Sequence, residues 1–147
     1  MSFLSDAFGD GSIVIKDSVV DRTQAISIAG ELLVSSQRAK PEYIDSMLEA
    51  VEKFGPYIVI APGIALAHGK PGEGVLATGL SLLLVRQAIE FGNLKNDPVQ
   101  LVFGLAATDH ESHLGIMAEL AEFLSDSERV NSLLTCSDLE QIRAVIA

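Results

Sequence analysis

Residues 75–85 read VLATGLSLLLV, and residues 99–106 read VQLVFGLA. Long apolar runs of this kind are typical of buried strands. The first run is interrupted at Thr78, Gly79 and Ser81 and is far shorter than the roughly 20 apolar residues of a membrane-spanning helix, so we expect no insertion into a membrane. Strands that are apolar throughout are covered on both faces, and the two runs therefore predict a sheet between two layers of helices.

The other elements are predicted from apolar spacing and from the positions of Pro and Gly. They are a strand at 13–15, helices at 21–38 and 41–54, a strand at 57–60, an extended segment at 64–66, a helix at 109–123 and two short terminal helices that follow SDSE at 125–128 and SDLE at 137–140. This order predicts the α/β class, as a three-layer α/β/α sandwich with a central mixed β-sheet. Because no repeat or Pro/Ser-rich linker divides the chain, residues 1–147 are expected to form a single domain.

Caps and buried faces are predicted for the helices as well. Asp17 or Asp21 is expected to cap the helix at 21–38, and Asp109 or Ser112 the helix at 109–123. The two SDxE segments have capping-box spacing from their serines. The residues expected on buried faces are Tyr43, Met47, Leu48, Val51 and Phe54 in the helix at 41–54, and Leu114, Met117, Ala118, Leu120 and Ala121 in the helix at 109–123.

The composition excludes several classes of protein. Twenty acidic side chains against ten basic ones give a formal charge of −10, which argues against binding to nucleic acid. Cys136 is the only cysteine, so an internal disulfide or a Cys-rich zinc site is excluded and a reducing compartment is indicated. Residues 1–6 contain no basic stretch followed by an apolar one, so we expect no secretory signal and a cytoplasmic protein.

His68 is the first candidate for chemistry. It follows the extended segment at 64–66 and precedes glycines at 69, 72 and 74, so we expect its side chain to be exposed. A neutral imidazole is a nucleophile near pH 7, and its attack on a phosphorus or acyl centre gives a covalent intermediate. From the residues alone, a surface histidine in a flexible loop is at least as good an interpretation.

His113 is the second candidate. It lies in the first turn of the expected helix, near free backbone N–H groups and the positive end of the helix dipole. This position favours a neutral ring and attracts anions, so His113 is suited to hold a phosphate oxygen. The alternative is a histidine bonded to its own backbone. The strand at 99–106 favours the functional interpretation, because ligand crevices of α/β folds form where such strands end.

Lys70 is a candidate for neutralising phosphate charge, or else an ordinary solvated lysine. Asp109, His110 and His113 offer a metal site as another alternative, but no further Cys or His lies nearby to complete a tetrahedral set. Residues 69–74 are rich in glycine but lack the Gly-Lys-Ser/Thr ending of a P-loop, so no nucleotide site is predicted.

Residues 55–68 read GPYIVIAPGIALAH and are followed by Pro71, Gly74 and Val75. This segment resembles the active-site segment of enzyme IIA components of the sugar phosphotransferase system, in the mannitol/fructose-type superfamily and most closely the ascorbate-type branch. Residues 109–120, which include His113, are similar to that family's second histidine motif. The resemblance covers nearly the whole chain in the order of its elements.

Two departures from the family's pattern involve three residues. The family usually has Pro where this chain has Ala67, and the ascorbate branch often has Ala-Arg where this chain has Gly69 and Lys70. Lys70 keeps the cation. The loss of the proline loosens the φ angle before His68 but does not remove the imidazole.

The resemblance implies that His68 accepts a phosphoryl group from the phosphocarrier protein HPr. His68 would then pass it to a cysteine of a cognate enzyme IIB, which serves the membrane enzyme IIC, and His113 would stabilise the phosphoryl group. No cofactor, nucleotide or metal would be required, and the transported compound would be ascorbate or a related sugar. Whether the chain forms a homodimer is left open.

Two further functions stay open from the sequence. One is a regulatory relative of these components, whose phosphorylation state is sensed by a binding partner without any sugar being transported. The other is a small metallohydrolase that uses His110 and His113.

Overall fold

The computed structural model describes residues 3–147, which are built around a mixed five-stranded sheet. Its strands are β1 (Phe8–Lys16), β2 (Val59–Ala61), β3 (Ile64–His68), β4 (Gly79–Ile89) and β5 (Val99–Ala106). They lie in the order β1-β4-β5-β3-β2. β1 runs parallel to β4 and β3 runs parallel to β5, while the other two pairings are antiparallel. Met1 and Ser2, which belong to the segment where no secretory signal is expected, lie outside the described residues.

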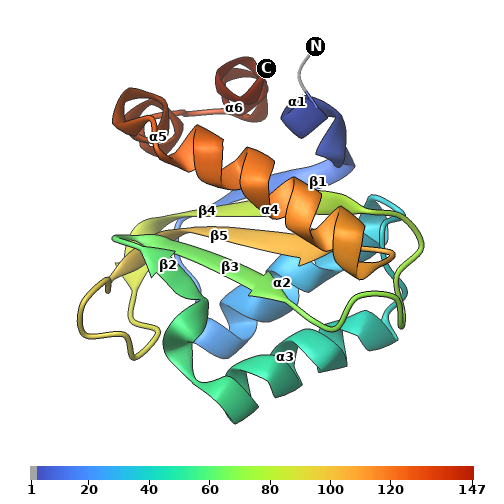
Figure 1. Ribbon diagram of the computed structural model, residues 1–147. Coiled ribbons are helices and arrows are strands. Elements are labelled where there is room, and N and C mark those ends of the chain that lie inside the picture. The colour runs from blue at the N-terminus through green and yellow to red at the C-terminus, as the bar shows by residue number, and fades with distance from the viewer. Residues whose placement is uncertain (1–2) are drawn as a thin grey trace.

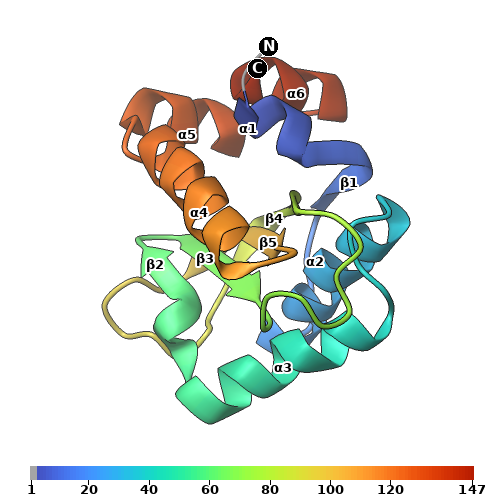
Figure 2. The same ribbon diagram turned by 45° about the vertical axis from the view of Figure 1, so that its right-hand side comes forward.

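Helices cover both faces of the sheet (Figures 1 and 2). α2 (Arg22–Ser35) and α3 (Glu42–Phe54) lie on one face. α1 (Phe3–Ala7), α4 (His110–Leu124), α5 (Ser127–Leu134) and α6 (Leu139–Ile146) lie on the other. The predicted α/β/α sandwich with a mixed sheet is therefore confirmed. Within residues 3–147, no helix combines the length and apolar character needed to cross a membrane.

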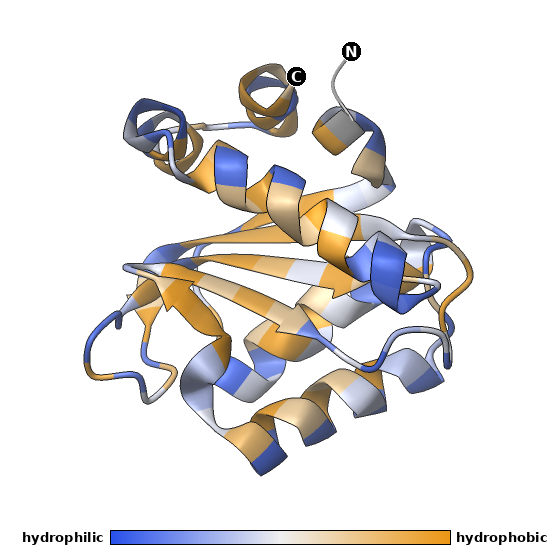
Figure 3. Cartoon of the chain, viewed as in Figure 1, coloured by the Kyte–Doolittle hydropathy of each residue, from blue (hydrophilic) through white to orange (hydrophobic). Residues whose placement is uncertain are grey.

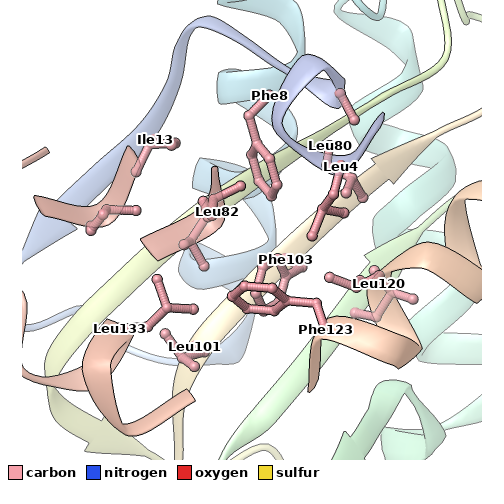
Figure 4. Packing of buried hydrophobic residues seen from close by; sticks show 14 of the residues in the cluster. Leu4, Phe8, Ile13, Leu80, Leu82, Leu101, Phe103, Leu120, Phe123 and Leu133 are labelled. Atoms are coloured by element: carbon pink, nitrogen blue, oxygen red, sulfur yellow. The ribbon is translucent and has the colours of Figure 1, made fainter. Parts of the chain in front are cut away.

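The two central strands supply side chains to two separate apolar layers, as predicted from their composition. In β5, Leu101, Phe103 and Leu105 pack toward α1 and α4–α6, whereas Val102 and Ala106 pack toward α2 and α3. Figure 4 shows Leu101 and Phe103 against side chains of the covering helices, and Figure 3 shows the apolar strands between the two helical layers. Burial on both faces fixes the sheet as the rigid centre of the molecule.

All but one of the predicted strands have different boundaries in the structure: β1 spans 8–16 instead of 13–15, β3 continues to His68, and β4 and the 57–60 segment differ as follows. β4 begins at Gly79 instead of Val75 and continues to Ile89, because residues 75–77 pair with the α2–α3 connection instead: Val75 forms an isolated bridge with Ala39, and the amides of residues 76 and 77 donate to the Arg38 carbonyl. The expected strand at 57–60 is divided into a 3₁₀ turn, η1 (Pro56–Ile58), and the short strand β2.

Helix caps agree with the prediction where an aspartate was expected. Asp21 caps α2 and Asp109 caps α4, each by accepting a bond from a backbone amide of the first turn. The capping-box prediction for the serines of 125–128 and 137–140 is wrong, because Asp126 and Asp138 are the capping residues. The short helix α1 was not expected from the sequence.

The buried faces of α3 and α4 are only partly as expected. Tyr43, Met47 and Val51 are buried on α3, and Leu120 is buried on α4. Phe54, Leu114, Ala118 and Ala121 were expected to be buried but are exposed; Ile116 and Phe123 are buried on α4 in their stead. Phe54 and Leu114 border the site described next.

Candidate active site

A cleft of about 720 Å³ opens where β3 ends, between α3 and the start of α4. Figure 2 shows the three elements around this end of the sheet. β3 and β5 are parallel neighbours, so their carboxyl ends lie together at the same edge. All three candidate residues from the sequence, His68, Lys70 and His113, line this cleft.

His68 is the last residue of β3, where it pairs with Leu105 of β5. The expectation of an exposed loop histidine is wrong: β3 extends two residues beyond the predicted segment, and the side chain is half-buried. Its Nδ1 lies 3.2 Å from the carbonyl oxygen of Leu66. Because a carbonyl only accepts, Nδ1 carries the proton, and the lone pair of the neutral ring is on Nε2.

His113 lies on α4, one turn inside the Asp109 cap. The Asp109 carboxylate accepts a bond from the Ser112 amide at 2.7 Å, and this amide, together with the Ser112 hydroxyl, lowers the pKa of Asp109 below its usual value. The rings of His113 and His68 face each other with centroids 5.3 Å apart and planes inclined by 61°. The structure therefore places side by side the two histidines that, according to the resemblance, act on the same phosphoryl group.

Both rings are held in the neutral form. Burial is the largest cause that lowers the pKa of His68 below 6.5, and the bond to the Leu66 carbonyl opposes it only in part. Burial also lowers the pKa of His113, and the nearby His68 and His110 lower it further by repelling a second positive charge. A neutral imidazole with a free Nε2 is the state that attacks an electrophilic phosphorus.

Lys70 lies on the exposed loop that follows β3 and lines the cleft two residues from His68. Its backbone amide donates to the hydroxyl of Ser46 on α3 at 3.2 Å. This bond fixes the start of the loop while the side chain is left at the surface. The cation is therefore available to an anion that enters the cleft.

An apolar rim borders the cleft. Phe54, Tyr57 and Leu114 each expose half or more of their surface. Tyr57 lies edge-on to both Phe54 and His68, with centroid distances of 5.8 and 6.4 Å. Exposed apolar side chains grouped beside a reactive residue are typical of a protein-docking surface. This rim was not predicted, because helical spacing assigns Phe54 and Leu114 to the core.

Acidic side chains surround the apolar rim. Glu42, Asp45 and Glu49 on α3 and Glu73 on the loop line the cleft. These carboxylates outnumber the lysines that line the cleft, Lys53 and Lys70. The entrance is therefore suited to a partner protein with a basic surface.

His110 begins α4 and also lines the cleft. In the part of the chain that the structure describes, no group of three or more His, Cys, Asp or Glu side chains is arranged to hold a metal ion. Asp109 is the third residue of the metal site considered from the sequence. Its carboxylate accepts a bond from the Ser112 amide as a helix cap.

Comparisons with known proteins agree with the resemblance seen in the sequence. Residues 7–147 match the family model described as phosphoenolpyruvate-dependent sugar phosphotransferase system, EIIA 2. The chain is 38% identical over 125 residues to the ascorbate-specific PTS system EIIA component of Escherichia coli strain K12, over 84% of this chain and 80% of that protein.

Solved structures share the fold over almost the whole chain. The mannitol-specific cryptic phosphotransferase enzyme IIA of Escherichia coli has a TM-score of 0.87 and 36% identity, with 97% of each chain covered. Enzyme IIAMTL, solved in complex with phosphorylated enzyme IIBMTL from Escherichia coli, has a TM-score of 0.82 and 27% identity, over 94% of this chain and 95% of that chain.

Nitrogen regulatory protein IIA-Ntr from Neisseria meningitidis also has a TM-score of 0.82, with 26% identity over 99% of this chain and 100% of that chain. The relatives thus include both sugar-specific and regulatory proteins. Since the family model spans residues 7–147 and the relatives align over most of their own length, the chain belongs to the EIIA family of the phosphoenolpyruvate-dependent sugar phosphotransferase system.

Proposed function

We propose that this chain is a histidine phosphoryl carrier that takes a phosphoryl group from phospho-HPr onto His68 and passes it to a cysteine of enzyme IIB. The observation that carries the proposal is the pair of neutral rings, His68 and His113, 5.3 Å apart in a cleft at the end of two parallel strands. Residues 1–147 act in this proposal as one cytoplasmic domain.

The first transfer moves a phosphoryl unit between two histidines. The N–P bond of the donor breaks, its electron pair stays on the donor ring, and a new bond forms between phosphorus and Nε2 of His68. Nδ1 keeps its proton in the bond to the Leu66 carbonyl. When the donor ring is protonated on its other nitrogen, no proton has to move during the step. In-line transfer of this kind needs positioning and charge stabilisation more than further covalent chemistry.

The second transfer returns His68 to its starting state. A cysteine thiolate of enzyme IIB attacks the phosphorus, the Nε2–P bond breaks, and the electron pair returns to Nε2 as the S–P bond forms. His113 supports both steps by donating a hydrogen bond to a phosphoryl oxygen, and Lys70 contributes a positive charge. No nucleotide, metal or other cofactor takes part in either step.

The surroundings of the cleft support protein partners. Phe54, Tyr57 and Leu114 provide an apolar contact area, and the acidic residues around them attract a basic phosphocarrier at long range. The neighbouring structure of enzyme IIAMTL with phosphorylated enzyme IIBMTL supports enzyme IIB as the acceptor. Enzyme IIB in turn serves the membrane enzyme IIC, and we propose ascorbate or a related sugar as the transported compound because an ascorbate-specific component is among the relatives.

The test is a two-step transfer of labelled phosphate. The chain is incubated with labelled phospho-HPr, and the label is mapped by proteolysis under neutral conditions, since phosphohistidine is labile to acid. We expect the label on the peptide that contains His68 and its loss to a cognate enzyme IIB added afterwards. No label, or label confined to a peptide without His68, would contradict the proposal.

A regulatory role is the second candidate, and the similarity to nitrogen regulatory protein IIA-Ntr supports it. Both roles use the same phosphorylated histidine, so the first incubation does not separate them. The second incubation does. Label that stays on this chain in the presence of ascorbate- and mannitol-type enzymes IIB favours the regulatory role, whereas rapid transfer favours transport.

A further inference from the structure

A buried hydroxyl joins the ends of two strands beside His68. Tyr43 of α3 is only 2% exposed. Its hydroxyl donates to the carbonyl of Leu105 at 2.8 Å and accepts a bond from the amide of Gly69 at 2.9 Å. Leu105 is the residue of β5 that pairs with His68, and Gly69 is the next residue after His68. One hydroxyl thus connects the two strands at the point where their ladder ends.

The two strand ends determine how far apart the two histidines lie. β3 carries His68 as its last residue. β5 ends at Ala106, only three residues before the Asp109 cap of the helix that carries His113. A small change in the separation of these ends would be passed to both rings, because the connecting segments are short.

The chain after His68 has little freedom to move toward α3. A Cβ atom placed on Gly69 would collide with the hydroxyl oxygen of Ser46 and lie 3.1 Å from a ring carbon of Tyr43. The same Ser46 hydroxyl accepts the bond from the Lys70 amide. Residues 69 and 70 are therefore held by two side chains of α3, at a distance that only a glycine allows.

The hydroxyl keeps its proton throughout the physiological range. Burial raises the pKa of Tyr43 to about 12, although the bond from Gly69 opposes the shift. Tyr43 is thus always able to donate to Leu105 and to accept from Gly69 at once.

We propose that Tyr43 is a positioning residue whose hydroxyl sets the separation of His68 and His113 for phosphoryl transfer. The proposal rests on the phosphoryl-carrier function of His68. Tyr43 is buried and is not among the residues that line the cleft, so removal of its hydroxyl should affect the rate of transfer within the docked complex and leave the docking of the partner unchanged.

The test compares Tyr43→Phe with Ser81→Ala. Tyr43→Phe keeps the ring and removes the hydroxyl. Ser81→Ala removes another buried hydroxyl, which donates to the Ala29 carbonyl at 2.7 Å. Ser81 is not among the residues that line the cleft. We expect Tyr43→Phe to lower the maximal rate of phosphoryl acceptance from phospho-HPr about tenfold, with an unchanged half-saturating donor concentration. Ser81→Ala is expected to lower the melting temperature but neither kinetic constant.

A second measurement does not depend on phosphoryl transfer. In the NMR spectrum of the wild type we expect nuclear Overhauser contacts between the ring protons of His68 and His113, and we expect Tyr43→Phe to weaken them while Ser81→Ala preserves them. If the wild type shows these contacts but accepts no phosphoryl group, the carrier function is contradicted. The role of Tyr43 in setting the ring separation is then decided by whether Tyr43→Phe weakens the contacts and Ser81→Ala preserves them. An unchanged maximal rate or unchanged ring contacts in folded Tyr43→Phe would overturn the proposal.

If Tyr43→Phe does not fold, Gly69→Ala tests the packing of residue 69 against α3 by a change in the loop instead of in the helix. The new methyl group meets Ser46 and should lower the maximal rate. Adding Ser46→Gly removes the Ser46 atoms nearest the new methyl group but also the hydroxyl that accepts from the Lys70 amide, so it should restore only part of the rate. Failure of Gly69→Ala to slow transfer, or of Ser46→Gly to restore any of it, would count against a positioning role for this contact.

Discussion

His68 and His113 face each other across one cleft but come from different surroundings. His68 ends a strand whose four preceding residues are buried. The chain just beyond it is bonded to Tyr43 and Ser46 of α3. His113 lies near the start of a helix whose first turn is largely exposed and is ordered by the Asp109 cap.

The difference suits the two roles that we propose, a nucleophile at His68 and a supporting donor at His113. A nucleophile must present one nitrogen in a fixed direction, and the strand end with the Leu66 carbonyl provides this for Nε2 of His68. A supporting donor has to follow a phosphoryl group that arrives and leaves, and a half-exposed helix start allows that adjustment. We therefore expect loss of the His68 ring to be far more damaging than loss of the His113 ring.

The largest effect is expected from His68→Ala. Phosphoryl acceptance from phospho-HPr should be abolished, because no other ring in the cleft has its nitrogen oriented by a strand backbone. The measurement is incorporation of labelled phosphate, with the melting temperature as a control for folding. Stable labelling of a folded His68→Ala protein would show that His68 is not the residue that accepts the phosphoryl group.

His113→Ala should reduce the rate of acceptance about 10²-fold without abolishing it, because the variant loses one hydrogen-bond donor to the phosphoryl oxygens in the transition state. Rapid-quench measurement of labelled His68 gives the rate. His113→Asn is the matched variant, since its amide keeps a donor, and it should recover part of the loss. Equal rates for His113→Ala and wild type would remove His113 from the transfer.

Asp109→Ala should slow acceptance severalfold, because the helix start that carries His113 loses its cap. Asp126→Ala is the control, since Asp126 caps α5 in the same way but lies away from the cleft. Both variants should have lower melting temperatures, and only Asp109→Ala should have a lower rate. A similar rate loss in both variants would mean that general destabilisation, not the position of His113, causes it.

The smallest effect is expected from pH. Burial lowers the pKa of both His68 and His113, so each ring stays neutral to a lower pH than an exposed histidine does. The decline in the rate of acceptance on acidification should therefore begin at a lower pH than the ionisation of an exposed histidine would cause. NMR titration of the ring protons checks the protonation directly, and a midpoint above 6.5 for His68 would contradict the effect of burial.

The same shifts predict how stability depends on pH. The unfolded chain protonates these rings near 6.5, whereas the folded chain does so at lower pH. Below 6.5 the unfolded state therefore binds more protons, and the free energy of unfolding should fall as the pH falls through that window. His68→Ala should make this decline shallower in thermal unfolding experiments.

Much of the fold could be predicted from local patterns. The apolar runs became β4 and β5, and the aspartates at 21 and 109 cap the helices for which they were proposed. The boundary at Val75 could not be predicted, because pairing with Ala39 depends on where the α2–α3 connection lies. Phe54 and Leu114 show the same limit: helical spacing predicts an apolar stripe, but only the neighbouring elements decide whether all of it is covered.

The site was predictable in its residue types more than in its arrangement. His68 and His113 were identified from their places after a strand and at a helix start, and Lys70 from its charge. Tyr43 was expected only as a core residue. Its hydroxyl bonds to residues 26 and 62 positions away, and no local spacing indicates such partners.

The sequence by itself determined which segments could be buried strands, where helices begin, and which side chains could act as nucleophile and support. Those properties depend on composition and on spacing within one element. Only the tertiary structure decided that His68 and His113 share one cleft, that burial keeps both rings neutral, and that Tyr43 holds the strand ends together. These depend on strand order and on packing between distant segments, because proximity in space is set by the whole sheet and not by any one of its strands.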